Sequence, residues 1–265
     1  MRWLLVLVAA VAWGQIVVRQ GEVIQVRTPG PAAEARMDGR TVRLFVQPEG
    51  GTLGLMPVPA LKAPGKYALD LVGADGKVLS SETVTVRDAH FRTQNVVLEK
   101  ATAELAPSPG EMDTVDAFLK SVSENRHWAE PLRLPVPGCM TSPFGVKRLR
   151  NGKPTGQIHA GLDQRSAAGR PVHAVADGVV KLVKAYNIHG GTVGIDHGQG
   201  LESMYLHLSR FAVAEGAVVK KDDVIGYSGS TGRSNAPHLH WSLYANGVPV
   251  NPLQWVGLQA CPVKR

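Results

Sequence analysis

The chain has 265 residues, of which 44% are hydrophobic and 19% charged, so it can bury one large core or two ordinary ones and is not a disordered polymer. Its 29 glycines, 18 prolines and few aromatic residues favour short strands and tight turns over a helical bundle. The formal net charge of +7 suits an anionic partner such as a wall polymer or a lipid surface.

The N-terminus has the pattern of a secretory signal. Arg2 precedes an apolar run over 3–12 that is too short to span a bilayer comfortably. We assign 1–14 to a signal peptide, cleaved near Gln15 or before Trp13, and the alternative is an uncleaved anchor. No later segment is apolar enough to cross a membrane, so we expect an exported protein, in the periplasm or the extracellular cell envelope, with no stable membrane span after cleavage.

Two cysteines, Cys139 and Cys261, are present. In an exported chain such a pair suggests a disulfide, and two free thiols are the alternative. Neither lies in a Cys-x-x-Cys arrangement, which argues against metal ligation by cysteine.

Short alternating runs follow the signal and predict a small β-sandwich over 15–88. Three clear strands are expected at 41–46, 66–72 and 82–86, and turn pairs such as Asp38-Gly39 separate the runs. We find no catalytic constellation in this part, which favours a spacer or docking module.

Residues 89–133 are expected to form a linker that contains one helix. Ser108 and Glu111 have the spacing of a capping box, and apolar residues then recur at helical spacing, which predicts a helix over roughly 111–127. We expect its apolar face to pack on a neighbouring domain.

Residues 134–265 are predicted to form a second domain, an antiparallel all-β structure with almost no helix. Its expected strands lie at 171–176, 178–183, 191–196, 203–207 and 223–227. The glycine-rich stretch 226–232 lacks the lysine of a phosphate-binding loop, so we interpret it as a tight turn.

Histidines in this second domain have the spacing of metal ligands. His238 and His240 are two apart, so both imidazoles lie on one side if the stretch is extended. Upstream, His159 and Asp163 offer an imidazole and a carboxylate. Three such ligands and a water form the open tetrahedral site of a catalytic zinc ion. The spacing leaves open which of His238 and His240 is the ligand.

These residues belong to a longer series of motifs over roughly 134–256. The series comprises Ser142-Pro143-Phe144-Gly145, His159-x-x-x-Asp163, 167–178, His197-Gly198, Tyr205-Leu206-His207-Leu208-Ser209, 226–234 and Pro237-His238-Leu239-His240. In this order it resembles the lysostaphin-type zinc peptidases, the M23 family of cell-wall endopeptidases. The resemblance implies that His159, Asp163 and His240 bind Zn²⁺ and that His207 and His238 are catalytic histidines beside the bound water.

The remaining histidines carry weaker expectations. We expect His173 to be a packed residue or to contact a ligand residue. His189 and His197 adjoin glycines at turns, where exposure is the default. No role is assigned to His90 or His127.

The chain departs from the family pattern in three places. No tyrosine lies between Ser142 and Ile158, and Arg148 or Asn151 is the candidate rim donor in its place. Ser242 stands where many relatives have an acidic residue, and Asn235-Ala236 replaces a commoner Thr-Gly pair. We expect these two differences to lie at the edge of the groove and to affect substrate preference.

The resulting hypothesis is a secreted zinc metalloendopeptidase that hydrolyses peptide cross-links of peptidoglycan by metal-activated water assisted by histidines. Its partners would be peptidoglycan stem peptides and cross-links, with no nucleic acid. The alternatives are a non-catalytic activator of a cell-wall amidase and a wall-binding module with the same fold. The sequence leaves open the bond that is cleaved, the role of the N-terminal domain and the oligomeric state.

Overall fold

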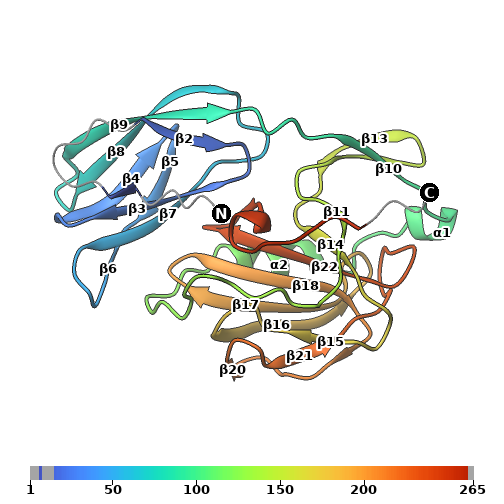
Figure 1. Ribbon diagram of the computed structural model, residues 1–265. Coiled ribbons are helices and arrows are strands. Elements are labelled where there is room, and N and C mark those ends of the chain that lie inside the picture. The colour runs from blue at the N-terminus through green and yellow to red at the C-terminus, as the bar shows by residue number, and fades with distance from the viewer. Residues whose placement is uncertain (1–5, 8–14, 262–265) are drawn as a thin grey trace. The chain divides into compact units, whose positions relative to one another are not determined.

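A computed structural model describes residues 6–7 and 15–261, and the chain forms two compact units, 1–90 and 91–265 (Figure 1). The predicted signal over 1–14 therefore lies outside the described residues, apart from Val6 and Leu7. Across the described ranges, the structure contains no helix with the length and apolar character needed to cross a membrane.

The first unit is built from two sheets. One has the strand order β1-β3-β7-β6 and the other β2-β9-β8-β4-β5. The bounds of the first sheet are β1 Val6–Leu7, β3 Val23–Thr28, β7 Thr52–Pro57 and β6 Phe45–Val46. Those of the second are β2 Ile16–Arg19, β9 Val78–Arg87, β8 Gly65–Gly73, β4 Ala32–Met37 and β5 Arg40–Arg43.

Alternation of side chains along these strands makes a single core between the two sheets. Val84 and Val86 on β9 are buried and share that core with Val26 on β3 and Met56 on β7. Between β4 and β5, Asp38-Gly39 forms the predicted tight turn, with both residues at positive φ (50° and 73°), which only such residue types adopt readily. The predicted β-sandwich is confirmed.

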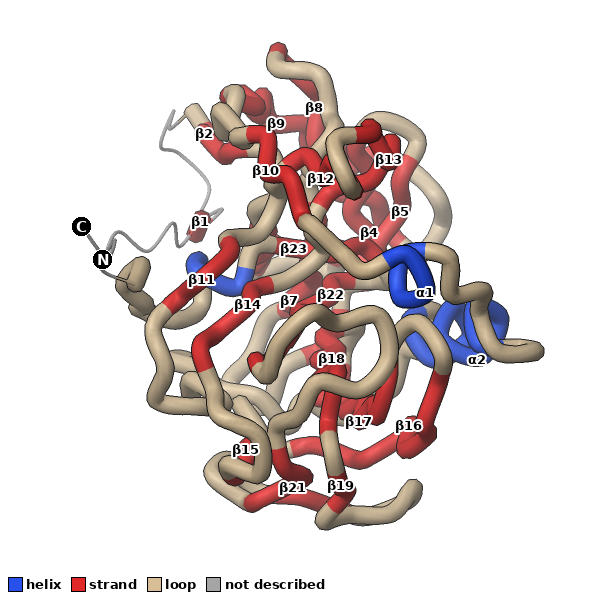
Figure 2. Tube along the Cα trace, turned by 90° about the vertical axis from the view of Figure 1, so that its right-hand side faces the viewer, coloured by secondary structure: helices blue, strands red, loops and turns tan. Residues whose placement is uncertain are grey.

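The second unit contains an eight-stranded sheet, ordered β11-β14-β22-β18-β17-β16-β20 with β23 beside β22. Its strands are β11 Met140–Ser142, β14 Leu162–Arg165, β16 Gly178–Tyr186, β17 Gly190–Gly198, β18 Leu201–Leu208, β20 Val218–Val219, β22 His238–Ala245 and β23 Val248–Val250. Every pairing in it is antiparallel, as predicted. Figure 2 shows β14, β22, β18 and β17 side by side.

Two three-stranded sheets and three short helices complete this unit. The sheets are ordered β10-β12-β13 and β15-β21-β19. Their bounds are β10 Thr93–Val96, β12 Lys147–Arg150, β13 Lys153–Ile158, β15 Pro171–His173, β21 Val224–Tyr227 and β19 Arg210–Phe211. The helices are α1 Lys100–Ala103, α2 Glu111–Leu119 and the 3₁₀ turn η1 Pro252–Gln254. The segment 91–133, expected as a linker, thus supplies β10, α1 and α2 to this unit.

Helix α2 begins where predicted but ends earlier than the predicted residue 127. Glu111 accepts a hydrogen bond from the Ser108 N–H at 2.7 Å, the reciprocal half of the predicted capping box, but the N-cap residue is Gly110. Val115 and Phe118 pack on the sheet of the same unit, as expected for the apolar face. After Leu119 the helix is not continued: Val122 is exposed, and Ser123 and His127 hydrogen-bond instead to Asp196 and His197 on β17.

A disulfide joins Cys139 to Cys261, 122 residues apart in sequence. Backbone hydrogen bonds flank it, because Cys261 N–H donates to the Met140 carbonyl at 2.8 Å and Met140 N–H to the Gln259 carbonyl at 2.9 Å. The structure therefore contains the disulfide, and not the two free thiols that were the alternative.

One buried carboxyl group in the sheet has no partner. Glu202 on β18 lies opposite Asp196 on β17, and among the described residues neither oxygen of Glu202 has a hydrogen-bond partner. Burial, with a smaller contribution from Asp196, raises the pKa of Glu202 well above its usual value. The folded state therefore keeps a proton that the unfolded chain loses near pH 4.3, so stability declines as pH rises from about that value through the folded pKa.

Substitution Glu202→Gln is expected to stabilise the protein at neutral pH by about 1–3 kcal/mol, because it removes the cost of holding a buried unpaired carboxyl group. Urea unfolding at pH 5 and pH 8 measures the effect, with the exposed Glu99→Gln as the matched control. The gain should be larger at pH 8. Equal gains at both pH values would contradict the raised pKa.

Candidate metal centre

Three neighbouring strands bring the candidate ligands together. Asp163 on β14 pairs with His240 on β22, and His240 pairs in turn with Leu206 on β18. His238 and His240 point to the same face of β22, as the spacing predicted. His159 directly follows β13 and reaches the same point.

The ligand atoms of His159, Asp163 and His240 form a nearly equilateral triangle. His159 Nε2 lies 3.0 Å from Asp163 Oδ1 and 3.0 Å from His240 Nδ1, and His240 Nδ1 lies 2.9 Å from the same carboxylate oxygen. Zinc bonds of about 2.0–2.1 Å at tetrahedral angles place ligand atoms roughly 3.3 Å apart. Among the described residues, this is the group of three whose spacing can hold a metal ion.

The protonation states of these ligand atoms also suit a bound cation. His159 Nδ1 donates to the Pro143 carbonyl at 2.8 Å, because a carbonyl oxygen only accepts, so in the neutral ring that a metal ion requires Nε2 carries a lone pair. That lone pair faces the carboxylate of Asp163 at 3.0 Å, a contact between two acceptors. A positive ion within the triangle removes this repulsion, so the donor set fits zinc.

A glycine makes the close approach of the strands possible. A Cβ atom on Gly161 would lie 2.3 Å from the Ser242 Oγ and 2.9 Å from the His240 Nε2. Ser242 itself is buried, and its Oγ lies 2.9 Å from His240 Nε2, where it fixes the ring from behind. Ser242 is thus not at the edge of the groove as expected. Because His238, His240 and Ser242 alternate on one face of β22, the period-two pattern was the signal that could have placed it.

Two further imidazoles border the triangle. His238 Nε2 lies 3.7 Å from Asp163 Oδ1, and the His207 ring centroid is 5.0 Å from that of His238. Nδ1 of His238 donates to the Ala236 carbonyl and Nδ1 of His207 to the Thr231 carbonyl, each at 2.8 Å. In the neutral form of either ring, therefore, Nε2 is the unprotonated nitrogen.

The backbone at His207 is specialised. Its φ is +61°, uncommon for a residue with a side chain, and β18 carries one extra residue relative to β17 at this point. The His207 N–H donates to the His189 carbonyl at 3.0 Å, and Glu111 accepts hydrogen bonds from the His189 N–H at 2.9 Å and from its Nδ1 at 2.6 Å. The N-terminus of α2 thus supports the bulge that aims His207 at the triangle.

Burial controls the protonation of the site. It lowers the pKa of His207 to about 3, with His238 and His240 adding to the effect, and lowers that of His240 to about 4 against the opposing effect of Asp163. Burial of Asp163 raises its pKa, but His159 and His240 lower it well below its usual value. Burial therefore keeps the His207 ring uncharged at neutral pH.

Arg148 lies behind the triangle rather than at the rim where it was expected. Its Nη2 donates to Asp163 Oδ2 at 3.0 Å and to Ser142 Oγ at 3.2 Å. The Ser142 hydroxyl donates to Gln94 at 2.7 Å, which agrees with the expectation that it is not a nucleophile. The Asn151 side chain hydrogen-bonds to the backbone of Leu98: its Oδ1 accepts from the Leu98 N–H, and its Nδ2 donates to the Leu98 carbonyl.

The other histidines are structural. His189 and His197 were expected at the surface and are not: His189 pairs with Glu111, and His197 is fully buried, with Nδ1 on the Asp177 carbonyl at 2.7 Å and Nε2 on Ser203 Oγ at 2.8 Å. His173 is half-buried and donates from Nδ1 to the Asp222 carbonyl at 2.7 Å. The glycines next to His189 and His197 predicted exposed turns, but other segments of the chain cover both turns.

Substitution Arg148→Ala is expected to weaken zinc binding about 10- to 100-fold, because Asp163 loses the partner that orients its carboxylate. Zinc affinity measured by competition with a chromogenic chelator tests this. Lys147→Ala, an exposed residue on the same strand, is the matched control. An affinity equal to that of the control would show that Arg148 does not position the ligand.

The match to known proteins agrees with this geometry. Residues 157–252 match the model of peptidase family M23. This range includes the three residues of the triangle and the two histidines that border it. A solved structure of a putative M23 peptidase from Pseudomonas aeruginosa superposes with a TM-score of 0.70 at 29% identity, and covers 90% of this chain and 94% of that one. The chain thus contains a peptidase family M23 domain over 157–252.

Two curated relatives match less than half of this chain. DD-carboxypeptidase/endopeptidase Mpg of Neisseria meningitidis is 45% identical over 114 residues, which is 43% of this chain and 26% of the relative. Peptidoglycan DD-endopeptidase ShyA of Vibrio cholerae is 37% identical over 115 residues, 43% of this chain and 27% of the relative. The similarity thus spans about a quarter of the length of each relative.

Proposed function

We propose that the chain is a zinc metalloendopeptidase that hydrolyses peptide cross-links of peptidoglycan. The observation that carries the proposal is the triangle of His159, Asp163 and His240 with the imidazoles of His207 and His238 beside it. The names of Mpg and ShyA, an endopeptidase and a peptidoglycan DD-endopeptidase, support the class of substrate.

In this proposal His159 Nε2, Asp163 Oδ1 and His240 Nδ1 hold the zinc ion. The ion supplies a Lewis acid that lowers the pKa of water and polarises the scissile carbonyl. Three protein ligands leave a position for water or substrate, as catalytic rather than structural zinc requires.

His207 and His238 are the proposed catalytic histidines. Each presents an unprotonated Nε2 toward the site, so each can accept a proton from the attacking water and pass it to the leaving amine. The carbonyls of Thr231 and Ala236 hold the opposite ring nitrogen and stabilise the positive charge that the ring acquires. Burial keeps both steps out of bulk water at His207.

Export to the cell envelope is part of the same proposal. The basic start and apolar run of 1–14 support it, and so does the Cys139–Cys261 disulfide, because such bonds persist in oxidising compartments. We assign 134–265 to the peptidase domain, 15–88 to a spacer or docking domain, and 89–133 to a linker whose β10, α1 and α2 form part of the same compact unit as the peptidase domain.

Digestion of purified peptidoglycan by the zinc-loaded full chain tests the function. We expect cross-linked muropeptide dimers to fall to monomers by mass spectrometry, with activity lost on chelation and restored by zinc. The product masses identify the bond. Stoichiometric zinc with no released product would contradict the proposal and favour a non-catalytic regulator.

A further inference from the structure

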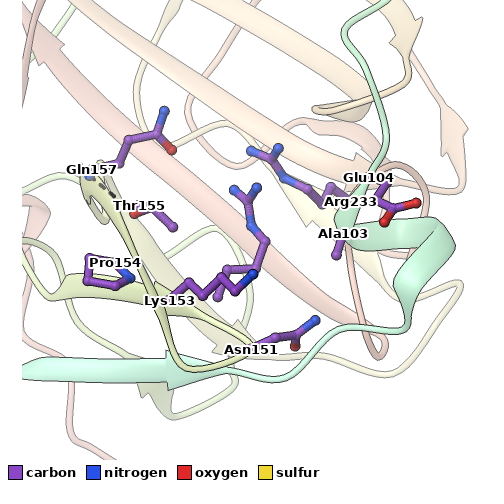
Figure 3. Close-up of a pocket in the computed structure, with 9 residues that line it drawn as sticks. Ala103, Glu104, Asn151, Lys153, Pro154, Thr155, Gln157 and Arg233 are labelled. Atoms are coloured by element: carbon purple, nitrogen blue, oxygen red, sulfur yellow. Dashed lines mark hydrogen bonds between the residues drawn. The ribbon is translucent and has the colours of Figure 1, made fainter.

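A polar pocket of about 450 Å³ lies in the second unit, outside the metal triangle (Figure 3). The β12–β13 hairpin forms one side, with Arg150, Lys153 and Gln157. Arg233, from the loop between β21 and β22, and Glu104, after α1, form the other. We call this the cationic pocket.

The segments that line this pocket also build the site. Strand β12 carries Arg148, which orients Asp163, and β13 leads directly into His159. The loop that carries Arg233 also carries Thr231, whose carbonyl holds His207. The same two segments therefore connect the pocket to the metal triangle, and a peptide that crosses the triangle can extend along them toward the pocket.

The charges in the pocket are unbalanced. Arg150 and Arg233 are half-buried, and within the described ranges their guanidinium groups, like the Lys153 amine, form no ion pair or hydrogen bond. Burial, and then the charge of Arg150, lower the pKa of Arg233. Glu104 is the acidic residue of the lining, and Figure 3 shows its carboxylate turned away from the Arg233 guanidinium.

Holding two half-buried guanidinium groups without partners is unfavourable in free energy, and a bound anion would offset this cost by pairing with them. Arginine offers a planar fork of donors that matches the two oxygens of a carboxylate. The Gln157 amide, which extends into the pocket opposite Arg233, adds a neutral donor (Figure 3). The pocket is thus suited to one compact, planar anion.

We propose that the cationic pocket binds a free carboxylate of the peptide substrate and so makes the enzyme selective for peptides that carry one beside the scissile bond. This inference rests on the proposed function. A peptide carboxylate is favoured over a phosphate polymer because the pocket is an open hollow of about 450 Å³, built from the segments that carry Arg148 and Thr231, rather than an extended basic surface.

The test uses two cross-linked peptides that differ only in one group, a free carboxylate or the corresponding carboxamide. We expect the zinc-loaded protein to cleave the carboxylate peptide with a kcat/KM about 10- to 100-fold higher, the range for charge-assisted hydrogen bonds. In the Arg150→Gln, Arg233→Gln double variant this ratio should fall toward one, mainly through KM. Lys147→Gln, which removes an exposed positive charge from the same hairpin, should keep it.

Binding of the same two peptides, measured by calorimetry, separates the two proposals. If neither peptide is cleaved, the proposed function fails, while carboxylate-dependent binding that disappears in the double variant still supports the pocket. Equal cleavage and equal binding of the two peptides would overturn the inference. So would a double variant that keeps the carboxylate preference but loses binding to poly(glycerol phosphate).

Discussion

Substitution His159→Ala is expected to release zinc and to abolish peptidoglycan hydrolysis. The variant leaves Asp163 and His240 as the only ligands of the triangle. Because loss of an outer partner alone costs about 10- to 100-fold in metal affinity, loss of a ligand should cost more than about 100-fold. Two measurements test this: the zinc content after dialysis, determined by elemental mass spectrometry, and the release of muropeptides from peptidoglycan.

His173→Ala is the matched control, because this histidine is half-buried and its ring hydrogen-bonds, within the part of the chain that the structure describes, to the Asp222 carbonyl alone. It should retain zinc and activity. If His159→Ala kept stoichiometric zinc after dialysis, the triangle would not be the metal centre.

Loss of the His207 imidazole is expected to reduce kcat by about 10²- to 10⁴-fold with zinc retained, the range for a general acid–base group. The neutral ring presents Nε2 to the site and is not part of the metal triangle. Muropeptide release at saturating substrate and zinc content measured on the same sample test this.

Two variants guard against a backbone effect. His207 has a φ of +61°, where asparagine is tolerated better than alanine. His207→Ala and His207→Asn should therefore lose activity equally although they differ in stability. Activity that recovered in His207→Asn would point to the backbone rather than to the imidazole.

The metal triangle was predictable because its signals are local. His238 and His240 alternate on one strand face, and a period of two is legible in the sequence. The choice of His240 as the ligand came from the family resemblance and not from spacing. The structure agrees with that choice in geometry, since His240 Nδ1 lies 2.9 Å from Asp163 Oδ1, whereas His238 Nε2 lies 3.7 Å away.

The supporting residues were not predictable, because they come from distant segments. Arg148 meets Asp163 through the β12–β13 hairpin, which no alternating pattern marked: Lys153, Pro154 and Gly156 break it. Gln94 lies on β10, which pairs parallel to β12 across more than fifty residues of sequence. Parallel pairing of this kind leaves no turn signal at either strand.

Local signals also misled where tertiary contacts override them. The apolar residue Val122 extended the helical pattern beyond Leu119, but it is 45% exposed and touches no core. Glycines beside His197 indicated a surface turn, yet the chain at Asn125 covers Gly198 so closely that a Cβ there would lie 1.7 Å from the Asn125 carbonyl oxygen. Burial decided both cases, and burial is a property of the whole fold.

The Cys139–Cys261 disulfide joins the start of the large sheet to the last described residue of the chain. Every peptide bond between these two cysteines, including those of the exposed hairpin tip at 151–154, therefore lies inside one covalent ring. A single cut by another protease within this ring leaves both fragments attached to each other. After the first nick the chain thus remains one molecule, with its candidate metal ligands on the same covalent body.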